Sequence, residues 1–492
     1  MNSVSTIIST LSEEEKDAFI MQLKQKNRRG DTKNIDLFKI LEQAPNTAHI
    51  DQLLYGKPSK GAYHALCKRL FDSLIDFIAS KSFEDEQSEE MDIFKLILAS
   101  RILFERKAYK IGFKTLQKAE HKAKSNDLYS VLAEVYYTKL QYAHFNASLS
   151  FDELVAQITL NNKNAAQEAQ MNLLYAQIQQ DLKVKKESIF KIIEARSKQF
   201  QLPLNATTTY RSLFKLMEIV NNAAHLSRNF ASVSPFVVQV EKVLQAKEKQ
   251  KAKHLFYHIH ILYFLANIHF RNRNFQKAQH FLEEMLLEMN KDANHKRFFY
   301  PQFTLLLVLN QNYLGNLKGA LQVLEHFNFN KHKHQIEYVY DLKLLQAILY
   351  MQQSDFEKSI QIFNEFYHSD QFYAKKVGEV WVVKKNLSEI LLRIELDQMD
   401  LVESRIKSFR KKHAPYLKAN NENRVLQFLS LVSEFYFNQE GNKKEYFLQK
   451  INTTFSAKKT NQEDIFVLSF FAWLKAKVTN TDVYKTTLEL LV

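Results

Sequence analysis

Glycine and proline are scarce in this sequence. The chain has 492 residues but only 8 glycines and 6 prolines, whereas average proteins contain about 7% and about 5% of these residues. Sheet-rich folds need many tight turns, which use both residues, so the composition argues against a β fold. Long helices joined by short polar loops need few of either. Hydrophobic residues make up 46% of the chain, which is enough apolar material for an extended all-α core.

Cysteine occurs once, as Cys67. A single cysteine excludes an internal disulfide and any zinc site that needs several thiolates, and a long chain without disulfides fits a reducing compartment. The surrounding segment 62–70 places Cys67 on the apolar side of a helical pattern. We interpret it as a small hydrophobic residue of the core, not as a nucleophile.

The sequence also lacks a long uninterrupted apolar run. Segments 256–270 and 467–474 are either broken by histidines or too short to span a bilayer. Residues 1–11 do not show the basic region and apolar stretch of a signal peptide. We therefore expect a cytoplasmic protein that does not use a membrane.

Known catalytic motifs are missing. The single Gly-Lys pair, Gly56-Lys57, lacks the preceding glycine of a phosphate-binding loop and is followed by Pro58. Neither the G-x-S-x-G elbow nor the H-E-x-x-H pattern occurs. His254 and His258 share a helix face, but no acidic or thiol ligand stands at a compatible spacing. We assign no catalytic, cofactor-binding or metal-binding residue and expect a protein that is not an enzyme.

Aromatic residues and regularly spaced polar breaks are what the sequence has instead. Phe (38) and Tyr (22) are abundant, and large flat side chains suit helix–helix interfaces. From about residue 91 onward, helical periodicity alternates with short polar segments, which predicts one helix hairpin after another. Such hairpins bury their apolar faces by stacking in a row. The predicted breaks include residues 124–127, 161–164, 205–208, 290–292, 369–370 and 420–423.

A spacing of small and large apolar residues recurs along the chain and is clearest at 259–292. There it is carried by Leu265, Ala266, Phe275, Ala278, Leu282 and Met285. A helix, a polar turn at 272–274 and a second helix follow one another in this segment. It thereby resembles the tetratricopeptide repeat family, whose unit is a helix pair with small residues where the two helices touch. A small residue at that place lets the helix axes approach to about 8–10 Å.

Four further segments match this pattern less completely: 340–369, 301–327, 91–123 and 387–409. The family's helix-ending proline is missing from all of them, and region 150–250 shows no clear match. From Ala278 through Ala320 and Ser359 to Ser404 the intervals are 42, 39 and 45 residues, where the family repeats every ~34. The resemblance therefore implies lengthened, degenerate repeats. The residues that carry the other matches include Tyr109, Gly112, Leu116, Ala119, Gly315, Ala347, Tyr350, Ser354, Phe363 and Asp400.

These patterns together predict an all-α fold. The resemblance implies that residues 86–492 form a right-handed superhelix of stacked antiparallel helix hairpins, a tetratricopeptide-like α-solenoid. An acidic stretch at 84–90 precedes it, and a run of one charge sign is typical of an exposed linker or a helix start. We therefore place the boundary there and expect residues 1–85 to form an N-terminal helical module.

In the tetratricopeptide family, the first helices of the repeats line a concave groove that binds peptides. Some members grip a C-terminal carboxylate there with Lys and Asn, but Tyr263 stands where that Lys would be, so we predict no carboxylate clamp. The alternative for all these side chains is simple packing between helices. The resemblance implies that the partner-binding residues are His260, Tyr263, Asn267, Phe270, Gln302 and Asn312, with Leu305, Leu344 and Met351 beside them.

Basic residues exceed acidic ones, 68 against 54, which gives a formal charge of +14. Clustered Lys and Arg side chains suit contacts with an anionic partner. The same side chains also complement the dipole at a solvated helix end, and we favour that reading. The candidate anionic-partner contacts are Lys247, Lys249, Lys251 and Lys253 in one cluster and Arg405, Lys407, Arg410 and Lys411 in another.

The sequence favours a non-enzymatic cytoplasmic scaffold or adaptor that binds a protein or peptide segment in the superhelical groove, without a cofactor. The alternative is a nucleic-acid-binding transcriptional regulator in which residues 1–85 bind DNA and the repeats act as a sensor arm. Predicted helices at 35–41 and 50–55 loosely resemble a helix-turn-helix, but residues 49–55 contain no Arg or Lys. Nucleic acid is therefore the less favoured partner.

Overall fold

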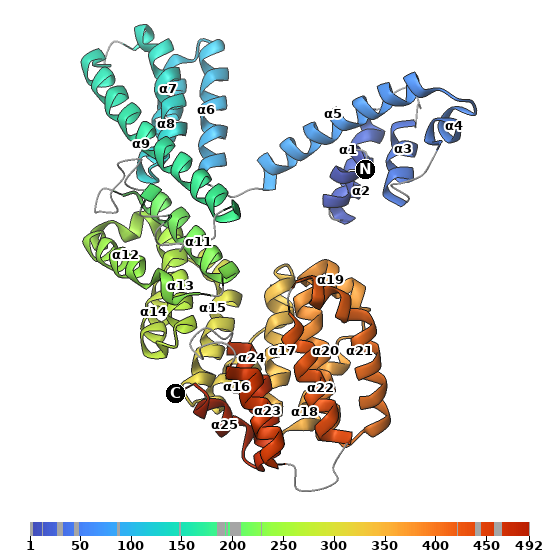
Figure 1. The fold of residues 1–492 in the computed structure, drawn as a ribbon. Coiled ribbons are helices and arrows are strands. Elements are labelled where there is room, and N and C mark those ends of the chain that lie inside the picture. Colours follow the sequence, from blue (N-terminus) through green and yellow to red (C-terminus); the bar gives the residue numbers. More distant parts are fainter. Residues whose placement is uncertain are drawn as a thin grey trace. The chain divides into compact units, whose positions relative to one another are not determined.

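Every regular element in the described part of the chain is a helix (Figure 1), which confirms the predicted all-α fold. The chain divides into two compact units, residues 1–165 and 166–492, and each is described by itself. None of the described helices is both long enough and apolar enough to cross a membrane. This computed structural model describes residues 3–11, 13–26, 33–43, 49–85, 89–146, 149–184, 192, 195–196, 208–227, 229–420, 422–437, 444–456 and 465–491.

The first unit contains two separate hydrophobic cores. Its helices are α1 (Ser3–Thr10), α2 (Glu13–Lys26), α3 (Lys33–Gln43), α4 (Ile50–Tyr55), α5 (Lys60–Asp85), α6 (Glu89–Glu105), α7 (Tyr109–Ser125), α8 (Tyr129–Gln141) and the start of α9 (Phe151–Val184). One core lies among α1–α5 around Phe19 and Phe38, with Cys67 half-buried at its side. The other lies among α6–α9 around Phe104. The predicted boundary near residue 85 falls between the two cores and stays a prediction.

The predicted break at residues 161–164 is wrong, because α9 runs unbroken through it. Asn161 is buried there, and its Nδ2 donates a 3.0 Å hydrogen bond to the backbone carbonyl of Tyr129. A partner on another helix removes the competition with the local backbone that makes Asn unfavourable inside helices. Of the predicted break at 205–208, residues 205–207 lie outside the described residues.

The second unit is a row of helices in which each packs mainly against its neighbours in the chain. The helices are α11 (Tyr210–Ser227), α12 (Ser234–Ala246), α13 (Leu255–Arg271), α14 (Phe275–Met289), α15 (Ala293–Tyr313), α16 (Leu317–Glu325), α17 (Ile336–Gln352), α18 (Phe356–Asn364), α19 (Asp370–Val377), α20 (Glu379–Glu395), α21 (Met399–Ala419), α22 (Asn423–Phe437), α23 (Lys444–Ser456), α24 (Ile465–Thr479) and α25 (Val483–Glu489). The predicted break at 290–292 is confirmed. Of the predicted break at 420–423, residue 421 lies outside the described residues, and Asn423 already begins α22.

A tight turn with one left-handed residue follows each of α13, α15, α17 and α20. A residue in this conformation lets the following amides bond back to the last carbonyls of the helix. After α13, for example, the amide of Arg273 donates to the carbonyl of Phe270 at 2.9 Å, and the amide of Asn274 donates to that of His269 at 2.8 Å. The predicted turn at 272–274 is thus confirmed. The left-handed turn residues of the second unit include Arg273, Gly315, Ser354 and Asp397, with φ values from 50° to 90°.

A fully buried residue follows each of these turns near the start of the second helix. Ala278, Ala320 and Ser359 are all 0% exposed, and the hydroxyl of Ser359 donates a 3.0 Å hydrogen bond to the backbone carbonyl of Ala347 on α17. The prediction that Ser404 fills this place on α21 is wrong, since Ser404 is exposed. Val402, at 0% exposure, lies there instead, because the turn before α21 comes earlier than the repeat match assumed.

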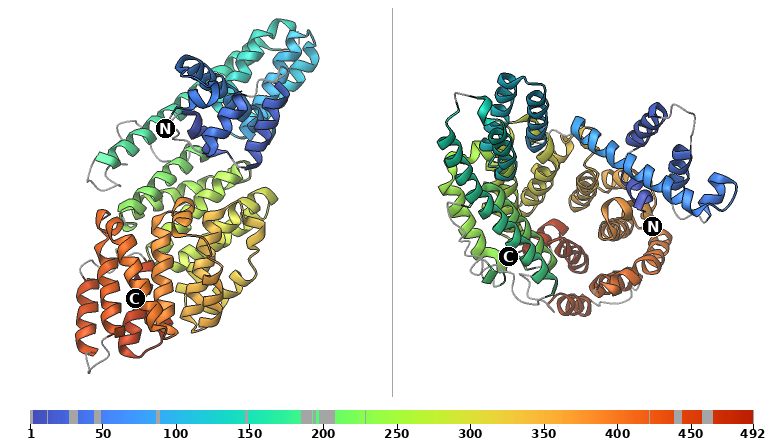
Figure 2. Two further views of the ribbon diagram at one scale, coloured as in Figure 1. Left: turned by 90° about the vertical axis from the view of Figure 1, so that its right-hand side faces the viewer. Right: turned by 90° about the horizontal axis from the view of Figure 1, so that it is seen from above.

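The last two helices leave the serial order and return to the middle of the row (Figure 1, Figure 2). The hydroxyl of Tyr484 in α25 donates a 2.7 Å hydrogen bond to the backbone carbonyl of Asn312 in α15. The hydroxyl of Tyr313 lies 3.1 Å from that of Ser469 in α24. Helices α24 and α25 therefore cover part of the face to which α15 contributes.

Candidate binding cavity

A cavity of about 260 Å³ lies between α13, α15, α17 and α20 on one side and α24 and α25 on the other. The residues that line it recur every three or four positions along each helix, which places them on one helix face. On α17, for example, they include Asp341, Leu345, Ile348 and Gln352. Of the predicted groove residues, those that line this cavity are Tyr263, Asn267, Phe270 and Asn312, together with Leu305, Leu344 and Met351.

Two predicted groove residues lie elsewhere. The ring of His260 packs 4.6 Å from that of Phe299 and 4.9 Å from that of Phe214. Burial lowers the pKa of His260 to about 4, so the imidazole is neutral at neutral pH. Gln302 is buried as well, and its Oε1 accepts a 3.0 Å hydrogen bond from the hydroxyl of Tyr338. Both residues pack between helices, which is the alternative that the sequence left open.

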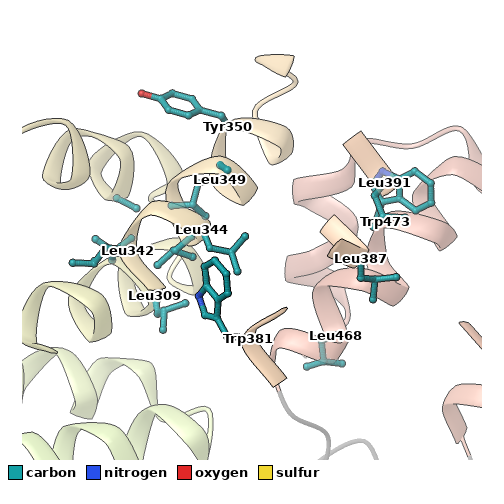
Figure 3. Close-up of a cluster of buried hydrophobic side chains, with 14 of the residues drawn as sticks. Leu309, Leu342, Leu344, Leu349, Tyr350, Trp381, Leu387, Leu391, Leu468 and Trp473 are labelled. Atoms are coloured by element: carbon teal, nitrogen blue, oxygen red, sulfur yellow. The ribbon is translucent and has the colours of Figure 1, made fainter. Parts of the chain in front are cut away.

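The wall of the cavity is largely apolar, with aromatic rings from both sides. Phe270 and Tyr263 come from α13, and Trp473 comes from α24. In the close-up of the core, Trp473 lies beside Leu391, with Leu344 on the opposite side (Figure 3). The indole Nε1 of Trp473 donates a 2.6 Å hydrogen bond to a carboxylate at the end of α20. The closing helix is therefore held by a polar contact as well as by apolar packing.

Three buried polar side chains in the wall each hold an atom without a hydrogen-bond partner. The atoms are Asn312 Oδ1, Gln352 Oε1 and Ser388 Oγ, and the residues are 2%, 7% and 1% exposed. A polar atom that loses water without gaining a partner costs about 1–3 kcal/mol, and most buried polar atoms in native proteins are paired. Three such atoms around one cavity indicate a place suited to a polar ligand.

Asp341 contributes a carboxylate to the cavity, and Lys384 and Arg271 contribute cations. Asp341 makes no hydrogen bond or ion pair with any residue that the structure describes. Burial raises the pKa of Asp341 to about 6, although the charge of Lys384 acts to lower it. Burial also raises the pKa of Tyr263 on the facing helix. At neutral pH the cavity therefore holds an ionised carboxylate and a protonated phenol.

Several residues of the two predicted basic clusters form ion pairs with acidic residues, and another is buried. Lys247 is buried, with its ammonium 5.8 Å from the centre of the Tyr210 ring, so it does not belong to a surface stripe as predicted. Several others form ion pairs: Lys251 with Glu288 at 3.2 Å, Arg405 with Glu389 at 2.8 Å and Lys407 with Glu403 at 2.6 Å. Lys249, Lys253, Arg410 and Lys411 are exposed. Contact of these clusters with an anionic partner stays a prediction.

A second pocket, of about 300 Å³, lies among α12, α13 and α14 and holds histidines and glutamates. The imidazole of His258 lies 3.6 Å from the carboxylate of Glu284, and a neighbouring pair joins His269 to Glu241 at 2.8 Å. The hydrogen bond with His269 lowers the pKa of Glu241, and the nearby imidazole of His258 lowers the pKa of Glu284. No group of three His, Cys, Asp or Glu side chains suited to a metal ion occurs in the described part of the chain.

Sequence reasoning missed several residues of the main cavity. Asp341 lies one helical turn before Leu344, which the resemblance placed in the groove, so the helical period alone could have found it. Lys384 and Ser388 share one face of α20, but no residue of that helix was predicted to line the groove, so the helical period gave no starting point there. Trp473 carried no such signal, because the return of α24 to this face depends on packing between distant parts of the sequence.

Comparisons with known proteins leave the family of this chain open. No protein-family model and no curated protein sequence matches it. Its function must therefore be inferred from the cavity and the helix pairs.

Proposed function

We propose that this protein is a non-enzymatic cytoplasmic scaffold or adaptor that binds a protein or peptide segment. The binding face would be the side of α13, α15, α17 and α20 that lines the cavity, within a right-handed tetratricopeptide-like superhelix. Two features support a repeat of this kind: the left-handed turns within the helix pairs and the fully buried small residues Ala278, Ala320 and Ser359.

The observation that carries the proposal is that α24 and α25 of the same chain lie on this face. They attach through an aromatic side chain, Trp473, and through polar contacts at the edge, such as the Tyr484 hydroxyl on the Asn312 carbonyl. Aromatic anchors and polar edges are also what partner segments use in helical grooves. A face that accepts two helices of its own chain has the chemistry to accept a helical partner beside or in place of them.

The test is a selection of peptides from a displayed library on the full-length protein. We expect the selected peptides to bind the wild type, and Leu305→Ala or Met351→Ala to weaken that binding about tenfold or more, because both side chains line the face. Leu287→Ala is the matched control, since this leucine of α14 is 67% exposed and does not line the cavity. Peptides that bind all four proteins equally would contradict the proposal.

A further inference from the structure

Asp341 differs from the other charged groups of the cavity in one respect. Lys384 and Arg271 each have interactions of their own within the protein, and the guanidinium of Arg271 lies 5.7 Å from the centre of the Phe230 ring. Asp341 has neither a hydrogen bond nor an ion pair with the described residues. Asp341 is partly exposed and lines the cavity, and a carboxylate that has lost part of its water without gaining a donor or a cation in contact is unfavourable. The group that lacks a partner in this cavity is therefore the acid.

We propose that the cavity binds a small organic cation, whose primary ammonium or guanidinium group contacts Asp341 and whose apolar body fills the remaining space. A charged head of this kind supplies the donors that the carboxylate lacks. The amide groups of Asn312 and Gln352 and the hydroxyl of Ser388 offer further hydrogen bonds within the same cavity.

The aromatic rings of the wall fit the same class of ligand. Tyr263, Phe270 and Trp473 present ring faces or edges to the cavity, and the faces of aromatic rings attract ammonium and guanidinium groups by about 0.5–2 kcal/mol. The same rings shield an aliphatic or aromatic body from water. An anionic ligand at the position of the ammonium group would be repelled by Asp341, although Lys384 and Arg271 also line the cavity.

The volume of the cavity and the two helices that close one side of it favour a small molecule over a segment of a partner protein. Its volume is about 260 Å³, which is near the lower limit of ~300 Å³ for small-ligand pockets. Helices α24 and α25 form one side of it, through Phe470, Trp473 and Val483 among others. These helices already occupy one side of the cavity, so the volume that remains beside Asp341 suits a small cation better than a protein segment. The ligand is therefore a second one, distinct from the protein partner proposed above.

The test uses three compounds of one shape that differ in the head group: phenethylamine, 2-phenylethanol and 3-phenylpropionate. We expect the amine to bind the full-length protein in calorimetric titrations, the alcohol to bind about tenfold more weakly or less, and the carboxylate not to bind. Trp381→Phe leaves Trp473 as the single tryptophan, so its fluorescence reports whether the compound enters this cavity. Tryptamine and agmatine extend the series to a larger body and to a guanidinium.

Asp341→Asn keeps the shape of the side chain and removes its charge, and we expect it to weaken amine binding about tenfold or more. Glu357→Gln is the matched control, because this glutamate of α18 is exposed, does not line the cavity and does not act on Asp341. The proposal is overturned if none of the amines or guanidines binds, if 3-phenylpropionate binds more tightly than phenethylamine, or if both variants bind the amine like the wild type. Binding of lysine-containing peptides without binding of the free amines would also overturn it, and would leave the scaffold proposal intact.

Discussion

The hydroxyl of Tyr484 donates a 2.7 Å hydrogen bond to the backbone carbonyl oxygen of Asn312, a residue 172 positions earlier in the chain. The bond attaches α25 to the end of α15, and the side chain of Asn312 lines the cavity that α25 helps to close. One contact thus links the attachment of the last helices to the shape of the candidate binding site.

Tyr484→Phe removes this hydrogen bond and keeps the ring. We expect the free energy of unfolding to fall by about 1 kcal/mol, and the amides of α25 to exchange with solvent faster than in the wild type. Hydrogen exchange followed by mass spectrometry measures the second effect. The control is Tyr137→Phe, a tyrosine that is 64% exposed. If α25 exchanged equally fast in wild type and Tyr484→Phe, the attachment described for it would not hold.

A substitution at Ser359 tests the close approach of α17 and α18. Ser359→Leu places a large side chain where the wild-type hydroxyl touches the Ala347 carbonyl at 3.0 Å, and we expect the free energy of unfolding to fall by about 1–3 kcal/mol or more. Ser404→Leu is the matched change at an exposed serine, with an expected effect within about 0.5 kcal/mol. Denaturant titrations compare the two variants. A larger loss at Ser404 than at Ser359 would mean that the register of the helix pairs is wrong.

Gly112 in α7 lies against the ring of Phe104 in α6. A Cβ at this position would meet the Phe104 ring at 2.6 Å, so Gly112→Ala forces the ring or the helix to shift and lowers the free energy of unfolding by about 1–3 kcal/mol. Gly61→Ala is the control in α5, where nothing lies within 4 Å of the new methyl group. There the lower entropy of the unfolded chain stabilises the protein by about 0.4–1 kcal/mol. The two substitutions should therefore shift the denaturation midpoint in opposite directions, and a shift of both in the same direction would contradict this packing.

The pH dependence of stability tests the environment of Asp341. Burial raises its pKa from 3.8 to about 6 in the folded protein, so the folded state binds this proton more tightly than the unfolded chain does. The stability that the group contributes is fully present below pH about 3.8 and is lost as the pH rises through about 6.

Asp341→Asn removes this ionisation. We expect the variant to be more stable than the wild type above pH about 6, by on the order of 1–3 kcal/mol, and the difference to vanish toward pH about 3.8. Melting temperatures of both proteins across this pH range give the difference in stability between them. The titration of the other groups is the same in both proteins and therefore cancels. A variant less stable than the wild type at neutral pH would show that the carboxylate has a partner after all.

Much of the local structure could be predicted from the sequence, because it depends on residues close together in the chain. The turn at 272–274 and the small residue Ala278 are local features, and Tyr263 and Asn267 reach one cavity because they share a helix face. The same reasoning failed where a neighbouring helix decides the outcome. Asn161 stays inside a helix because the Tyr129 carbonyl receives its amide.

The cavity as a whole could not be predicted. His260 lies one turn before Tyr263 but packs against Phe299 of the next pair, and nothing near it in the sequence distinguishes the two positions. The closing helix brings Trp473 next to Glu395, 78 residues earlier. Such a contact depends on the packing of every helix between the two, which no local pattern encodes.

Helix α24 lies against the face of α15, α17 and α20 and closes the cavity there. Acrylamide quenching of the Trp381→Phe variant tests it most directly, because its single tryptophan is Trp473, which is 4% exposed and is hydrogen-bonded to Glu395. We predict blue-shifted emission and weak quenching, with Tyr137→Trp in a chain without Trp381 and Trp473 as the exposed reference. Quenching of Trp473 as strong as that of the reference would contradict the account.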